Sequence, residues 1–282
     1  MPEKLALQAT DWRALRSALI LGMGMAVLAG LGVLGACASA PEAAAVAAGD
    51  LLTPSDEPAA RKRARIRLEL ALAYFEQGQT TVALDELNQA LQADPVYAPA
   101  HNLRGLIYLR LKDFSVADES FRKALVLNPR DANVKHNLAW LLCQQQRWPE
   151  SFQRFEQVLS DPGYTEQAKT FRALGLCQAR AGMSDQAERN LLKSHEYDPA
   201  NPVTLFNLAA LMHARGDLPR AQWHVRRLNN SELANAESFW LGVKVERGLD
   251  NRVAMEQLSL QLVKRFPLSR ESDSLQRGAF DE

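Results

Sequence analysis

The sequence predicts an all-α fold, a right-handed superhelical solenoid of six helix-turn-helix repeats. Two observations predict it: an apolar pattern that returns every 34 residues from Ala64 onward, and turn residues such as EQGQ, ARAGM and ARGD between the paired helical stretches. A single helix pair cannot bury its apolar face alone, so the units are expected to stack on one another.

The repeated positions explain how two helices of a unit pack. Small residues at the eighth and twentieth positions allow close approach, a large apolar residue at the twenty-fourth fills the remaining space, and Pro ends the second helix because it lacks an N–H. The first two units match at Tyr74 and Tyr108, Ala83 and Ala117, Leu87 and Phe121, Ala90 and Ala124, and Pro95 and Pro129. This pattern resembles the tetratricopeptide repeat.

The repeat pattern divides the chain into regions. A repeat domain is predicted over residues 61–270, and residues 271–282 are predicted to be a C-terminal tail with a frayed end. The six repeats are expected at approximately 64–97, 98–131, 132–166, 168–201, 202–234 and 235–268.

The first 36 residues have the pattern of a bacterial export signal. Arg13 and Arg16 precede an uncharged apolar stretch that ends in small residues. A transmembrane anchor is the alternative, since residues 17–36 are long enough to span a bilayer, but five glycines weaken such a helix and no basic cluster follows. Leu34-Gly35-Ala36-Cys37 resembles the lipobox of bacterial lipoproteins, which implies a lipid on Cys37.

Residues 37–60 are predicted to be an Ala/Pro-rich tether, because they lack aromatic residues and have little bulky apolar surface to bury. Removing residues 1–36 takes three basic and two acidic side chains from the 33 of each sign and leaves 30 basic and 31 acidic. A nucleic-acid surface would require a clear basic excess, so no nucleic-acid partner is expected.

A partner-binding groove is expected on the first helices of the repeats. In this register five apolar side chains of the first two units face the groove: Leu68, Leu72, Phe75, Leu106 and Leu109. An exposed apolar strip of this size is typical of a binding site. Two alternatives stay open, that the tether folds back over the strip and that the register is off by one. Later units are basic there through Lys169, Arg172 and Arg180, which suits either an acidic segment or solvent.

Cys143 and Cys177 lie on first helices of neighbouring units, where they could form a disulfide or remain free core residues. We expect free thiols, because a bridge requires Cα atoms within about 7 Å and packed helices usually stand farther apart. The chain contains no GxSxG, P-loop or HExxH motif, and its five histidines lack metal-ligand spacing. No enzymatic activity, metal, cofactor or small-molecule substrate is therefore expected.

The chain as a whole resembles the type IV pilus biogenesis lipoproteins that act as secretin pilotins. The resemblance is carried by RLELALAYFEQGQTTVALDELNQALQADP, YAPAHNLRGLIYLRL and PRDANVKHNLAW, and it extends over about residues 60–270. The chain departs from the pattern at Ser151, where such repeats prefer Ala, and in a long, weakly charged N-terminus that leaves the start codon open.

The resemblance implies an outer-membrane lipoprotein that faces the periplasm, binds secretin subunits and promotes their localisation and multimerisation. Ala38, after the cysteine, favours outer-membrane delivery, since lipoproteins retained at the inner membrane typically carry Asp there. The rival within binding proteins is a scaffold for another envelope complex, in outer-membrane protein assembly or cell division. An enzyme would need a domain outside the repeats, and no stretch of the chain is left to form one.

Overall fold

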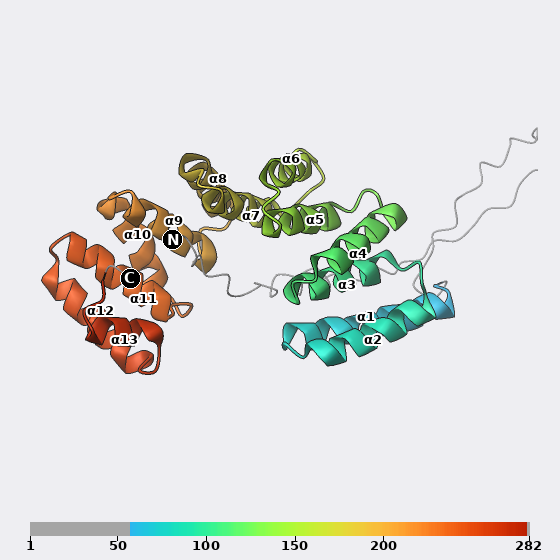
Figure 1. The fold of residues 1–282 in the computed structure, drawn as a ribbon, viewed down its shortest axis with the longest axis horizontal. Helices are drawn as coiled ribbons and strands as arrows, with labels where there is room; N and C mark the ends of the chain where they lie inside the picture. Colours follow the sequence, from blue (N-terminus) through green and yellow to red (C-terminus); the bar gives the residue numbers. More distant parts are fainter. Residues whose placement is uncertain (1–56, 281–282) are drawn as a thin grey trace, which may run out of the picture. The chain divides into compact units, whose positions relative to one another are not determined.

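A computed structural model describes residues 57–280, and all of their regular structure is helical. The predicted all-α class is confirmed, and the first twelve helices form six consecutive pairs (Figure 1). In chain order they are α1 (Ala59–Glu76), α2 (Thr80–Ala93), α3 (Ala98–Arg110), α4 (Phe114–Leu127), α5 (Ala132–Gln144), α6 (Trp148–Leu159), α7 (Gln167–Arg180), α8 (Ser184–Tyr197), α9 (Pro202–Ala214), α10 (Leu218–Asn229), α11 (Ala236–Gly248), α12 (Arg252–Arg265) and α13 (Arg270–Gln276). The predicted export signal, the lipobox with Cys37 and most of the tether lie outside the described residues.

The described chain divides into two compact units, one ending at Pro95 and the other starting at Val96. The first unit is the helix pair α1–α2. The residues buried in this pair recur at helical spacing: Ala64, Ala71 and Phe75 on α1, and Ala83, Leu87 and Ala90 on α2. Arg67 Nη1 donates to Glu86 Oε2 over 2.8 Å, and Arg61 also pairs with Asp94, so ion pairs connect α1 to α2 and to the residue after it.

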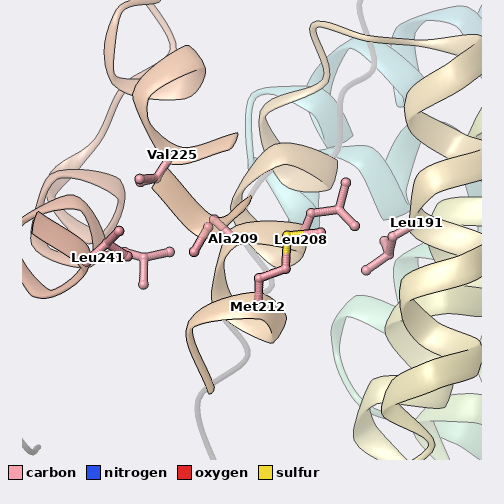
Figure 2. Packing of buried hydrophobic residues seen from close by; sticks show 8 residues of the cluster. Leu191, Leu208, Ala209, Met212, Val225 and Leu241 are labelled. Atoms are coloured by element: carbon pink, nitrogen blue, oxygen red, sulfur yellow. The ribbon is translucent and has the colours of Figure 1, made fainter. Parts of the chain in front are cut away.

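The second unit stacks five helix pairs and the short helix α13. Its core contains clusters that join successive pairs, and the last cluster joins α11 and α12 to α13. Figure 2 shows one of them, in which Leu191 of α8, Leu208 and Met212 of α9, and Leu241 of α11 converge. Burial between pairs, rather than within them, is what makes the unit a stack.

Glycine at the eighth position brings paired helices together. A Cβ on Gly105 would lie 2.4 Å from a ring carbon of Phe121, the large residue on the opposite helix. Gly175 meets Leu191 in the same way at 2.8 Å. The close approach expected from the repeat pattern is therefore present in α3–α4 and α7–α8.

The turn inside each pair contains one residue with positive φ. Gly78, Gly182 and Gly216 occupy it with φ between 76° and 78°. In the other pairs the same place is taken by Lys112, Gln146 and Asp250, with φ of 62°, 60° and 53°. Only the glycine-containing turns were expected from the sequence, although all six turns share one backbone geometry.

The expected frayed C-terminus is wrong for residues 272–280. Helix α13 packs against α11 and α12, and the Ser272 hydroxyl donates to the Phe266 carbonyl oxygen over 2.7 Å. Beyond the helix, the Phe280 ring stacks on Trp240 of α11 with centroids 5.2 Å apart. The repeat pattern does not predict this C-terminal helix, because a single short helix that covers the last pair is not a further 34-residue repeat.

Candidate partner-binding surfaces

The predicted strip on α1 is only partly accessible. Leu68 and Leu72, one turn apart, are half-buried, so each presents part of its side chain to solvent. Phe75 is 2% exposed, and the expectation that its ring faces water is wrong. Its ring is among the largest fully buried side chains of the described residues, because α1 turns this position inward together with Ala71.

On α3 the strip has two further members. Leu106 and Leu109 are half-buried and pack against the core cluster that contains Phe121, Val134 and Leu138. The edges of both leucines that face this cluster are buried, and the remaining area stays exposed. Each unit therefore contributes two partly exposed leucines, Leu68 and Leu72 from one and Leu106 and Leu109 from the other.

The two cysteines are joined by a disulfide, with Cα atoms 5.9 Å apart. The expectation of free thiols on helices too far apart to bridge is therefore wrong. The physical reason lies in the small side chains between α5 and α7, since Ala139 and Ala173 belong to the same buried cluster as the cysteines. Ser151 also lies there, and its hydroxyl donates to the Ala139 carbonyl oxygen over 2.9 Å, so this departure from Ala is accommodated.

Asn137 and Asn207 stand where an amide could bond a peptide backbone, but both are already engaged. The Asn137 amide donates to Asn102 Oδ1 over 2.9 Å, from α5 to α3. The Asn207 amide donates to the Val203 carbonyl oxygen of its own helix over 2.8 Å. Both side chains are under 9% exposed, so their first role is to join helices or satisfy a backbone group.

Cations gather on the side of α7 that contacts α5. Lys169 donates to Glu166 over 2.9 Å and to Asn133 of α5 over 3.3 Å. The Arg180 guanidinium lies over the Trp140 ring, 5.3 Å from its centroid, and burial lowers the pKa of this guanidinium. Next to them His136 is buried, and burial together with the charges of Lys169 and Arg172 holds its pKa well below the ordinary value.

Within residues 57–280 no group of three or more His, Cys, Asp or Glu side chains is arranged to hold a metal ion. Over the same residues, no helix combines the length and apolar character needed to cross a bilayer.

Paired helices with a 34-residue spacing between equivalent positions, such as Cys143 and Cys177, define a tetratricopeptide repeat protein. Models of the tetratricopeptide repeat match residues 68–132 and 132–161. The chain is 28% identical to the type IV pilus assembly protein PilF of Pseudomonas aeruginosa over 209 residues, which are 74% of this chain and 83% of that protein.

Solved structures agree with this relationship. The crystal structure of PilW, a widely conserved type IV pilus biogenesis factor, superposes with a TM-score of 0.68 at 30% identity and covers 76% of this chain and 98% of PilW. The structure of Pseudomonas aeruginosa PilF gives 0.67 at 27% identity, with 78% of this chain and all of that one covered. The chain belongs to the PilF/PilW family of type IV pilus tetratricopeptide repeat proteins.

Proposed function

We propose that this chain is an outer-membrane lipoprotein that binds secretin subunits and promotes their localisation and multimerisation for type IV pilus assembly. The observation that carries the proposal is the relationship to PilF and PilW, which extends over about three quarters of the chain. Stacked repeats of this kind form an extended surface that binds other proteins, which supports a protein-binding role in pilus assembly.

In each unit the partly exposed leucines are a proposed contact with the secretin. Leu68 and Leu72 on α1, and Leu106 and Leu109 on α3, retain exposed apolar area although their inner edges are packed. Burying that area against an apolar secretin segment would gain about 25 cal/mol per Å². Phe75 is left out of the contact because its ring is already buried.

The lipid is proposed on Cys37, and residues 37–60 are proposed to act as its tether. Holding the protein and its bound secretin at one membrane surface raises their effective concentration, which favours ring assembly. Changing Cys37 to Ser should release the chain from the outer-membrane fraction and reduce secretin rings there. A Cys37→Ser protein that remains in that fraction at wild-type level would contradict the anchor.

The leucine contact is tested with Leu72→Glu and Leu106→Glu in cells that express the secretin. Each should lower secretin multimers by about tenfold, because a carboxylate placed in an apolar contact removes its main contribution. Leu260→Glu is the matched control, since Leu260 is 73% exposed on α12, a helix that carries none of the four leucines. Unchanged multimers in folded Leu72→Glu and Leu106→Glu proteins would show that the leucines do not form the contact.

The partner itself is identified by a photo-crosslinking residue at Leu72, followed by mass spectrometry of the captured protein. Capture of the secretin supports the proposal. Capture of a component of outer-membrane protein assembly or of cell division would instead favour a scaffold for that envelope complex.

A further inference from the structure

A second surface, on α5 and α7, has a different chemistry from the leucine strip. Arg172 comes three residues after Lys169, and Arg180 comes eight residues after Arg172 and eleven after Lys169. At helical spacing these three side chains lie along one side of α7. Asn133 and Trp140, two turns apart on α5, lie beside them, as the Lys169–Asn133 and Arg180–Trp140 contacts show. These five residues are called here the α5/α7 surface.

The α5/α7 surface is half-buried rather than fully solvated. All five side chains are of intermediate exposure, and the Trp140 ring packs against the core cluster around Phe155. The disulfide between Cys143 and Cys177 joins the same two helices, so the helices that carry the surface are covalently linked. A rigid, partly desolvated surface loses little conformational entropy when a partner binds.

The charge of Arg180 is incompletely compensated by the side chains of the described residues. Lys169 is paired with Glu166, but Arg180 forms no ion pair within residues 57–280 and lies instead against the Trp140 ring. Burial lowers the pKa of Arg180, which indicates that its charge has lost part of its hydration. A carboxylate brought to this guanidinium would replace the lost water with two parallel hydrogen bonds.

We propose that the α5/α7 surface binds an acidic segment of a partner protein, with a carboxylate on Arg180 and a neighbouring apolar side chain against Trp140. Arginine favours this geometry because its planar fork matches a carboxylate, and Trp and Arg are the residues that most often dominate protein contacts. A nucleic acid is the less suitable occupant, because the described chain offers no extended basic excess to follow a phosphate backbone. This site goes beyond the proposed function and requires neither a secretin nor a lipid.

The test measures binding of a fluorescent short peptide of Glu, Ala and Leu to the full chain by fluorescence anisotropy. Binding should weaken in high salt, and a peptide with Gln in place of Glu should not bind. The Arg172→Gln/Arg180→Gln variant should lose about tenfold in affinity, as expected for truncating one partner of a partly desolvated charge pair. Arg180→Lys, which keeps the positive charge without the planar guanidinium, should lose less affinity than the double variant.

The matched control is Lys123→Gln/Arg130→Gln, which removes two exposed cations outside α5 and α7, one on α4 and one in the turn that precedes α5. Circular dichroism establishes that every variant is folded. An equal loss in this control, no binding of the acidic peptide, or equal binding of the Gln peptide would each overturn the proposal. Two further outcomes would assign the surface to another occupant and overturn the proposal as well. One is tighter binding of a single-stranded oligonucleotide than of the acidic peptide. The other is self-association of the wild type that the Arg172→Gln/Arg180→Gln variant abolishes. Because no secretin is present, failure here leaves the leucine contact standing.

Discussion

His136 Nδ1 lies 2.7 Å from the Thr170 hydroxyl oxygen, so equivalent parts of neighbouring repeats, 34 residues apart, meet through a buried polar pair. The Tyr164 hydroxyl lies 2.8 Å from the same Thr170 oxygen, and burial raises the pKa of Tyr164 to about 12. The contact between His136 and Thr170 joins α5 to α7 in the interior, where leaving an imidazole or hydroxyl without a hydrogen-bond partner would be costly.

This arrangement predicts lower stability in acid. The folded-state pKa of His136 is held well below 6.5 by burial and by the charges of Lys169 and Arg172. As pH falls below 6.5, the unfolded chain takes up a proton that folded His136 does not, so the free energy of unfolding decreases until the folded pKa is reached. Well above pH 6.5 neither state binds this proton, so His136 adds nothing to the pH dependence of stability.

Urea denaturation of wild type and His136→Gln between pH 8 and pH 5 measures this effect. The wild-type midpoint should fall across this range more steeply than that of His136→Gln, although the variant is less stable at pH 8. Parallel curves for the two proteins would show that His136 is not the responsible group.

Loss of the disulfide should destabilise the second unit. Cys143 and Cys177 close a loop of 34 residues, and removing such a cross-link costs about 2–4 kcal/mol by raising the entropy of the unfolded chain. Thermal melts of Cys143→Ser/Cys177→Ser should show this loss. Reductant should lower the wild-type melting temperature towards that of the variant and leave the variant unchanged; equal melting temperatures without reductant would contradict the cross-link.

Gly105 should not tolerate a side chain. A Cβ there would lie 2.4 Å from the Phe121 ring, which is fully buried and cannot move aside freely. Gly105→Ala is expected to cost about 1–3 kcal/mol in the free energy of unfolding, as for other overpacked cores. Gly163→Ala is the control, because its nearest neighbour is a side-chain oxygen of Asp161 at 3.4 Å. Equal stability of the two variants would show that α3 and α4 can separate at no cost.

Gln146 should be improved by glycine. Its φ of 60° places a side-chain-bearing residue in the left-handed region, where three other repeats have Gly. Gln146→Gly is expected to stabilise the fold by about 0.5–1 kcal/mol, since relief of the steric cost exceeds the added entropy of the unfolded chain. Gln153→Gly, at an exposed position inside α6, should instead cost about 1 kcal/mol. Chemical denaturation of both variants gives the comparison, and destabilisation by Gln146→Gly would contradict it.

Local pattern was sufficient for the helices and for their pairing. Ala83 recurs 34 residues later as Ala117, and Leu87 recurs as Phe121. These positions recur because each helix pair, taken separately, requires side chains of a certain size for its two helices to approach closely. Such a requirement is satisfied by residues near one another in the chain, so it can be recognised without knowing the tertiary structure.

The orientation of single side chains could not be obtained in that way. Phe75 was assigned to an exposed face by its position in the repeat, and the structure buries its ring. Whether such a position faces solvent depends on the neighbouring repeat, which the periodicity of one helix does not describe.

By itself the sequence determined an all-α repeat protein, because helix periodicity and turn chemistry act over a few residues. Only the tertiary structure decided that Cys143 and Cys177 approach to 5.9 Å, that residues 270–276 close the last pair as a helix, and that Arg180 meets Trp140. Each of these depends on the distance between elements far apart in the chain, which is set by packing of the side chains between them.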